Sequence, residues 1–279
     1  MAQPSTPPAA GITVAQIHRC RLGQKPKSHR DRLAAEEPLQ IRVRGRNVAV
    51  TMRTPGNDEE LAAGFLLSEG IIHRSSDVTA IAHCGQGGGP GDDNTINVFL
   101  SPSVRVNFKH LTRHVFASSS CGLCGKASID AVHQHFPPVQ SEIVIPMKTI
   151  VRLPARLRAA QKMFTRTGGL HGAGIFDAKG RLMVAREDAG RHNAVDKVIG
   201  HGLLQNLLPF EANILLVSGR ASFEIMQKAL AARVPVICAV SAPSSLAVKF
   251  ARESGQTLIG FLRGDTMNIY SHPERIICH

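Results

Sequence analysis

The sequence predicts an α/β fold in which a smaller N-terminal α+β subdomain precedes a C-terminal part built on a parallel sheet. Three observations support this prediction. From residue 213 onward, apolar runs typical of buried strands alternate with helical segments. Before residue 110, strand patterns surround a single clear helix. The 279 residues, of which 43% are hydrophobic, allow one large or two modest domains with an ordinary core.

Residues 1–35 are predicted to form a disordered basic arm. Residues 1–11 are rich in Pro and Ala and lack the charged and apolar regions of a signal peptide, so we expect a cytoplasmic protein. Basic side chains then gather densely at His18, Arg19, Arg21, Lys25, Lys27, His29, Arg30 and Arg32. Such a stretch is typical of a solvated, flexible segment.

Residues 36–115 are predicted to form the N-terminal α+β subdomain. Asn57 and Glu60 stand at capping-box spacing and open a helix, which Gly70 ends. Apolar and β-branched runs predict strands at residues 39–43, 47–52, 78–82, 95–100 and 103–107. The glycine-rich loop at 85–91 is followed by no Lys-Ser/Thr pair, so it is not a phosphate-binding P-loop.

Residues 116–139 are predicted to form a mobile loop and a helix around Cys121-Gly122-Leu123-Cys124-Gly125. Apolar residues at near-helical spacing follow the two cysteines, until Pro137-Pro138 stops the pattern. The cysteines therefore stand at or just before a helix N-terminus. There the backbone N–H groups and the helix dipole favour the reactive thiolate over the thiol.

Residues 140–279 are predicted to form the C-terminal α/β domain. Its elements are a helix over 154–164, a hairpin with strands at 174–176 and 181–185, a helix over 191–199 that Gly200 ends, strands at 213–217, 235–240 and 257–261, and helices at 222–232 and 244–253. Apolar strands separated by helices predict a parallel sheet that is covered on both faces.

Three turns of this domain are candidates for a binding site, because ligands of open α/β sheets bind beyond the carboxyl ends of the strands. They span residues 218–222, 241–245 and 261–266. Two interpretations stay open. The turns only connect elements, or their backbone N–H groups bind an anion together with Arg220 and Arg263.

A polar block at residues 187–193, with Asp196 and Lys197 after it, also allows two interpretations. It forms an ion-pair network that stabilises the fold, or it lines a site. His171 lies in a glycine-rich loop and by itself indicates no site.

The net charge of +12 suits polyanionic ligands or an acidic partner. Tryptophan is absent and Tyr270 is the single tyrosine, which argues against a base-stacking surface for nucleic acid. No apolar run is long enough to span a membrane.

The cysteine pair could bind metal, exchange disulfides, carry sulfur or be unreactive. Structural zinc needs four ligands, and the chain has no second Cys-x-x-Cys; His133 and His135 have the wrong spacing, although His110 or His114 could contribute. We therefore predict no metal site. A thioredoxin-like site would lie near a βαβ pattern. An exposed, activated thiol instead suits a carrier that visits two partners.

Four segments of the chain resemble the FdhD family: Cys121 to Gly125, Glu187 to Lys197, Ser218 to Glu224, and Gly260 to Gly264 with Asn268 and Tyr270. The resemblance runs from about residue 40 to residue 275. It implies a sulfurtransferase, or sulfur carrier, required for formate dehydrogenase activity, with a cytidine-deaminase-like fold in the C-terminal domain and a homodimeric state. The H-x-E and P-C-x-x-C motifs of a zinc deaminase are absent in that order, so deaminase chemistry is disfavoured.

The resemblance also implies partners and ligands. Sulfur is accepted as a persulfide from a cysteine desulfurase and passed to the molybdenum cofactor, bis(molybdopterin guanine dinucleotide), for formate dehydrogenase. No cofactor is expected to be held tightly; the molybdenum cofactor is bound as the sulfur acceptor, and GDP is a possible ligand. We expect no nucleic-acid or membrane partner.

The site residues follow from thiol chemistry and from the resemblance. Cys121, the first cysteine of the pair, is the predicted persulfide carrier, and Cys124 assists or releases the sulfur. By analogy with the family, the predicted cofactor contacts are Phe261, Leu262, Arg263, Gly264, Asp265 and Thr266, followed by Ser218, Gly219 and Arg220.

Two alternatives from other classes remain. A basic, zinc-stabilised nucleic-acid-binding module would hold stoichiometric zinc and bind strands in a salt-dependent way. A dithiol oxidoreductase would reduce disulfides of a general protein substrate.

Overall fold

The computed structural model describes residues 11–85, 94–108 and 136–278. The Cys121–Cys124 motif, the helix predicted after it and most of the predicted glycine loop lie outside the described residues. Among the described residues, no helix is both long and apolar enough to cross a membrane.

The largest sheet has six strands in the order β13-β12-β11-β10-β8-β9. Its members are β8 (His171–Asp177), β9 (Leu182–Asp188), β10 (Asn213–Val217), β11 (Val236–Ala239), β12 (Thr257–Arg263) and β13 (Thr266–Ser271). Only the three central strands, β10, β11 and β12, run parallel. The strands that helices separate are therefore parallel, as predicted, and the predicted hairpin supplies the antiparallel pair β8 and β9. The edge strand β13, which was not predicted, is antiparallel because a tight turn joins it to β12.

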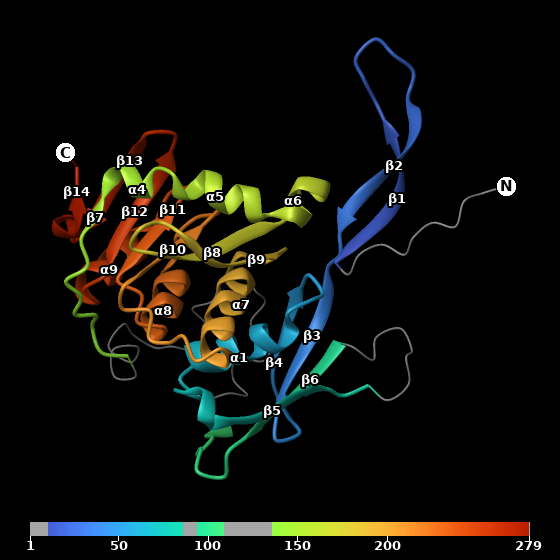
Figure 1. The fold of residues 1–279 in the computed structure, drawn as a ribbon. Helices are drawn as coiled ribbons and strands as arrows, with labels where there is room; N and C mark the ends of the chain where they lie inside the picture. The colour runs from blue at the N-terminus through green and yellow to red at the C-terminus, as the bar shows by residue number, and fades with distance from the viewer. Residues whose placement is uncertain (1–10, 86–93, 109–135, 279) are drawn as a thin grey trace.

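Helices cover both faces of this sheet, as predicted (Figure 1). In β10, Leu215 and Val217 belong to one core cluster and Ile214 and Leu216 to the other. This alternation follows from the two-residue period of a strand. The first face carries α7 (Arg191–Leu204), α8 (Phe223–Ala231) and α9 (Ser245–Glu253), and the second carries α4 (Met147–Ile150) and α5 (Leu153–Ala160).

A second, four-stranded sheet has the order β4-β3-β6-β5. Its strands are β3 (Glu37–Val43), β4 (Arg46–Arg53), β5 (Val78–His83) and β6 (Thr95–Leu100). These confirm four of the five strands predicted for this region, but residues 103–107 form none. Buried residues of this sheet and of α1 (Asp58–Ser68) share one core cluster with α7, α8 and α9. The boundaries of the predicted subdomains remain a prediction, although this core runs across them.

The helix α1 begins after Asn57, as predicted, but without the predicted capping box. Asn57 has a left-handed backbone (φ 58°), and its side chain caps no N–H group of the helix. The carboxylate of Glu60 instead accepts two hydrogen bonds from Arg186 on β9. Glu60 thus pairs with the guanidinium of Arg186 on a distant strand and does not form the local cap.

The helix α7 does not end at Gly200 but continues to Leu204. Gly200 serves a different purpose, because a Cβ there would overlap the carbonyl oxygen of Glu60 on α1. Gly64 on α1 is the counterpart, since a Cβ there would overlap the carbonyl oxygen of Asp196. Two facing glycines therefore let the backbones of α1 and α7 approach closely.

The predicted disordered arm was wrong for residues 12–34, which form a hairpin of β1 (Ile12–Arg19) and β2 (Lys27–Ala34). The strands pair through a full antiparallel ladder, and the turn between them closes with a bond from Gln24 N to Arg21 O. Backbone hydrogen bonds between the two strands thus order a segment that was predicted to be disordered because of its dense positive charge. We call residues 12–34 the basic hairpin.

The predicted helix over 154–164 is split in two. Its second part is α6 (Lys162–Thr167), and Gln161 between α5 and α6 leaves the helical region with ψ 76°. The remaining short elements are β7 (Ile145–Pro146), which pairs with β14 (Ile276–Ile277), and the 3₁₀ turns η1 (Ser75–Asp77) and η3 (Pro273–Arg275).

Candidate functional site

The three strand-end turns lie side by side at the carboxyl edge of β10, β11 and β12. Val240 N donates to Val217 O at 3.2 Å, and Phe261 N donates to Ser241 O at 3.1 Å. The Nε of Arg263 reaches across to Val240 O at 3.0 Å. The structure therefore brings together the three turns for which a shared anion site was one of two open interpretations.

The third turn begins with a bulge in β12. The pairing of β12 with β13 is irregular between Gly260 and Arg263, and Phe261 has a left-handed backbone with φ 51°. A Cβ at Gly260 would lie 2.8 Å from Pro243, so glycine lets the second and third turns touch. Strained, non-glycine positions of this kind are concentrated at functional sites, and the bulge turns the Phe261 side chain into solvent.

The residues predicted to contact the cofactor differ in their exposure to solvent. Arg220, Arg263, Gly264 and Asp265 are exposed at this edge. Leu262 is fully buried in the core beneath α4 and α5, so it cannot contact a ligand here. Successive side chains of a strand point to opposite faces, so Leu262 is buried while Phe261 and Arg263 on either side of it are exposed.

A cavity of about 620 Å³ adjoins these turns. Helices α5 and α6, the loop before β8 and the ends of β10 and β11 line it, through Pro154, Leu157, Arg158, Gln161, Phe164, Gly169, His171, Ser218 and Val240. Its wall therefore combines apolar side chains with the polar groups of Arg158, Gln161, His171 and Ser218, a combination that is typical of small-molecule sites. The guanidinium of Arg158 stacks on the ring of Phe164 at 3.9 Å.

His192, at the start of α7, connects this edge to α8. Its Nε2 lies 3.1 Å from Ser222 Oγ, and its Nδ1 lies 3.3 Å from Glu224 Oε2. Burial, aided by the positive charges of Lys228 and Arg191, lowers the pKa of His192 to about 3. The ring is thus neutral at physiological pH and can hold the first turn in place by hydrogen bonds.

A second histidine and an arginine complete this side of the site. His171 lines the cavity next to Gly219, where a Cβ would lie 3.3 Å from its Nδ1. Burial and the nearby charge of Arg191 lower the pKa of His171. The Nε of Arg191 is buried without a hydrogen-bond partner among the described residues. A buried cationic donor of this kind suits an anionic ligand.

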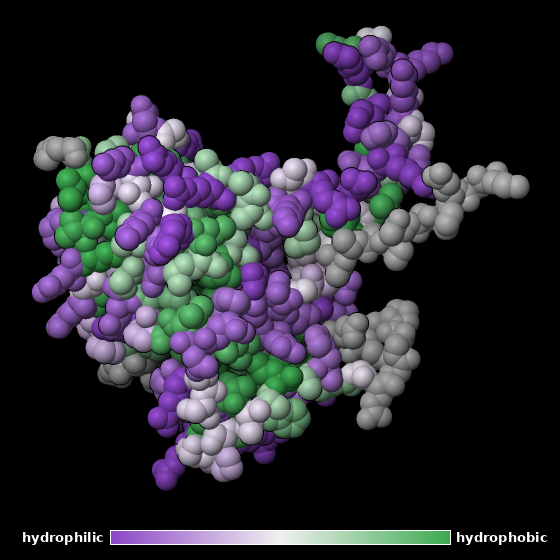
Figure 2. Space-filling view, viewed as in Figure 1, coloured by the Kyte–Doolittle hydropathy of each residue, from purple (hydrophilic) through white to green (hydrophobic). Residues whose placement is uncertain are grey.

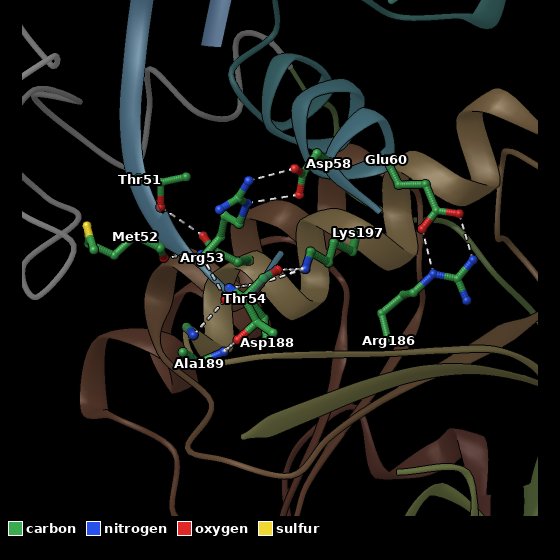
Figure 3. A network of polar contacts seen from close by, with 12 residues as sticks. Thr51, Met52, Arg53, Thr54, Asp58, Glu60, Arg186, Asp188, Ala189 and Lys197 are labelled. Atoms are coloured by element: carbon green, nitrogen blue, oxygen red, sulfur yellow. Dashed lines mark hydrogen bonds and ion pairs between the residues drawn. The ribbon is translucent and has the colours of Figure 1, made fainter. Parts of the chain in front are cut away.

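The rest of the polar block stabilises the fold (Figure 3). Asp188 is fully buried and pairs with Lys197 Nζ at 2.7 Å, and it accepts a bond from Thr54 N. Lys197 also donates to Thr54 O at 2.8 Å. This network ties β4 to β9 and α7. Of the two interpretations of the block, the ion-pair network therefore holds for Asp188 and Lys197, while Arg191 and His192 face the site.

Sequence reasoning did not identify Arg191, His192 or Glu224 as neighbours of the first turn. Their only sequence signal was membership of two polar segments about thirty positions apart, and pairing those segments needs the tertiary fold.

Four lone cysteines are placed: Cys20, Cys84 and Cys278 are exposed, and Cys238 is buried. Cys238 is fully buried in the core, and this burial raises the pKa of its thiol, so we expect it to be unreactive. Within the described ranges, no group of His, Cys, Asp and Glu is arranged to hold a metal ion.

Comparisons with known proteins agree over nearly the whole chain. Residues 34–277 match the model of the FdhD/NarQ family. The sulfur carrier protein FdhD of Mycobacterium tuberculosis is 51% identical over 251 residues, which cover 88% of this chain and 91% of that protein. Its counterpart of the same name from Streptomyces coelicolor is 50% identical over 255 residues, with coverages of 88% and 89%. The crystal structure of a candidate formate dehydrogenase accessory protein from Desulfotalea psychrophila superimposes with a TM-score of 0.77 at 26% identity and covers 96% of this chain and 100% of its own.

Proposed function

Because the chain belongs to the FdhD/NarQ family, we propose that it is a sulfur carrier that serves formate dehydrogenase. The observation that carries the proposal is the family match over residues 34–277, a span that includes the pair Cys121 and Cys124. Relatives at about half identity carry the printed name of sulfur carrier. The geometry adds a cavity beside a basic edge of the sheet, which suits a bulky anionic sulfur acceptor.

The first step is the uptake of sulfur from a cysteine desulfurase. The Cys121 thiolate attacks the terminal sulfur of the donor's cysteine persulfide. A new S–S bond forms on Cys121 as the donor's S–S bond breaks, and the donor cysteine leaves as a thiolate. No net oxidation occurs, and the protein now carries a persulfide.

Cys124 has a role in release. Its thiolate attacks the inner sulfur of the Cys121 persulfide, which forms the Cys121–Cys124 disulfide and frees hydrosulfide for the acceptor. The two thiols are oxidised as the sulfane sulfur is reduced to sulfide. A dithiol reductant then returns the pair to the thiol state for the next cycle.

The acceptor is the molybdenum cofactor, bis(molybdopterin guanine dinucleotide), which enters formate dehydrogenase afterwards. Its pyrophosphates need N–H donors and cations, and the strand-end edge provides Arg220, Arg263 and the buried donor Arg191. The guanine nucleotide portion predicts that GDP binds at the same edge. We also propose that the C-terminal domain is cytidine-deaminase-like, that the protein is a homodimer and that it lies in the cytoplasm. A sheet with helices on both faces is compatible with the cytidine-deaminase-like fold.

Mass spectrometry of the persulfide tests the function. After incubation with a cysteine desulfurase and cysteine, the wild-type chain is expected to gain sulfur on the peptide that contains Cys121. The Cys121→Ala variant is expected to gain none there and to lose activation of formate dehydrogenase, whereas Cys278→Ala, an exposed cysteine elsewhere, behaves as wild type. Stoichiometric zinc with salt-dependent nucleic-acid binding would favour the first alternative instead. General disulfide reduction without sulfur uptake would favour the second.

A further inference from the structure

The basic hairpin stands away from the body of the protein (Figure 1). Its base is anchored: Ala35 N donates to Gly11 O at 2.9 Å, and Gly11, with φ 88°, fits closely against Met163 of α6 and Thr54. Packing at Gly11 therefore holds the base of the hairpin against the body of the protein. The side chains beyond the base are largely exposed.

An isolated two-stranded ribbon is only marginally stable in water, because neither face is covered by a core. The apolar side chains of this one are left in solvent: Val14 is 54% exposed, Leu33 44%, and Leu22 at the tip is fully exposed. A ribbon of this kind gains stability and buries these side chains when a partner covers it.

The charge of the basic hairpin indicates the partner. It contains six Lys and Arg residues and one acidic residue, Asp31, so its charges cannot be neutralised internally. In the observed register Val14 lies opposite Arg32 and Gln16 opposite Arg30, so both arginines share one face with Val14. Figure 2 shows the hairpin covered mainly by hydrophilic residues, with few apolar ones between them.

The base of the hairpin borders the cavity of the candidate site. Gly169 lines the cavity, and a Cβ at this position would lie 3.6 Å from the Cβ of Ala34, the last residue of β2. A Cβ at Gly11, at the base, would lie 3.0 Å from Met163 Sδ, and Phe164, next to Met163, lines the cavity. A protein bound to the hairpin is therefore placed beside the cavity.

We propose that the basic hairpin is the docking arm for a protein with an acidic, partly apolar surface, and that this protein is the one that supplies the sulfur. The inference rests on the proposed function, in which the strand-end edge is occupied by the acceptor and leaves the arm to the donor. Nucleic acid is a poorer occupant, because residues 12–34 contain no Phe, Tyr or Trp to stack on bases and expose apolar groups that phosphates do not contact. A second copy of the hairpin is disfavoured by repulsion, since each hairpin carries six Lys and Arg residues against one acidic residue; the homodimer proposed above is expected to form through another surface.

The test uses the full-length protein and its own organism's cysteine desulfurase. The variant Arg30→Glu/Arg32→Glu reverses the charge of one face of the hairpin. Its matched control, Lys148→Glu/Lys179→Glu, makes the same charge change at exposed positions on α4 and in the β8–β9 turn. We expect the hairpin variant to bind the desulfurase at least tenfold more weakly than wild type at low salt, and the control to bind within about twofold. Raising the salt concentration should weaken the wild type more than the hairpin variant.

Persulfide loading separates this inference from the proposed function. With inorganic polysulfide as the sulfur source, the hairpin variant should load as fast as wild type, because no docking is needed. A circular dichroism spectrum that matches wild type shows that the variant is folded. With the desulfurase as the source it should load at least tenfold more slowly. Equal loading from the desulfurase would overturn the docking arm alone, whereas no loading of wild type from either source would overturn the function as well. If wild type is a dimer and the hairpin variant is not, the arm binds a second copy of the chain and the proposal is rejected. If wild type binds duplex DNA tightly and in a salt-dependent way, the arm binds nucleic acid and the proposal is likewise rejected.

Discussion

At the scale of single residues, burial decides what the polar groups of the site can do. His192 and Arg191 are adjacent in the sequence, yet one is a neutral hydrogen-bond bridge and the other a cation with a buried donor. The difference arises because desolvation removes the proton from an imidazole but not from a guanidinium. The site is therefore positive without the histidines, and His192 positions the first turn.

The lowered pKa of His192 predicts a pH dependence of stability. Its folded value of about 3 lies below the ordinary value of 6.5, so the unfolded chain binds the proton more readily between these limits. The stability that the neutral ring contributes is present above pH 6.5 and is lost as the pH falls toward 3. Urea unfolding at several pH values should show that wild type loses up to about 1.4 kcal/mol per pH unit more than His192→Gln between pH 6 and 4.

Asp196 titrates in the same range with the opposite sign, because burial raises its pKa to about 6. It is present in both proteins, so its contribution cancels in the difference between them. Parallel curves for wild type and His192→Gln would show that His192 is not held neutral.

Arg263 is the residue on which the nucleotide site depends most. A charge-assisted bond to a phosphate is worth roughly 1.5–3 kcal/mol, so Arg263→Ala should weaken GDP binding at least tenfold in calorimetry. Lys179→Ala, which removes an exposed charge away from the edge, is the control. An unchanged affinity of Arg263→Ala would remove this turn from the site.

At the scale of elements, the strands and helices of the C-terminal part could be predicted closely from the sequence. The apolar runs of β10, β11 and β12 are long enough and sufficiently β-branched to predict strands. Helices α8 and α9 begin after Ser222 and Ser244, whose side chains cap them. Two predictions about helix ends were wrong: Gly200 was expected to end α7, and Asn57 was expected to cap α1. In both cases a contact with a distant element, unknown from local sequence, decided the outcome.

The crossing of α1 and α7 gives the prediction at this scale. Gly200→Ala places a methyl group against the backbone of Glu60, and two packed helix backbones cannot shift cheaply. We expect the free energy of unfolding to fall by about 1–3 kcal/mol or more, in spite of the better helix propensity of alanine. Gly169→Ala, whose methyl group meets only ordinary contacts, should change it by a few tenths. A more stable Gly200→Ala protein would contradict the close approach.

At the scale of the whole molecule, one core cluster joins the four-stranded sheet, α1 and the first face of the large sheet. The buried pair of Asp188 and Lys197 lies where these parts meet and binds the backbone of Thr54 on both sides. The expected consequence is that the described parts of the chain unfold together.

Lys197→Met tests this cooperativity. It leaves the Asp188 carboxylate buried without its cation, which typically costs about 3–5 kcal/mol. Hydrogen exchange should show that β4 and α7 lose protection together with the strands of the large sheet. Separate loss of the four-stranded sheet at a lower denaturant concentration would instead support two independent domains.

The sequence by itself determined the α/β class, the order of most elements, the basic charge and the resemblance through the cysteine pair, because local periodicity, composition and short motifs are properties of neighbouring residues. Only the tertiary structure decided that the sheet is mixed, that residues 12–34 form a ribbon, that two glycines join α1 to α7, and that Arg191 and His192 face the strand-end turns. Each of these depends on atoms that are far apart in the chain, and their contact energies exist only once the backbone has brought them together.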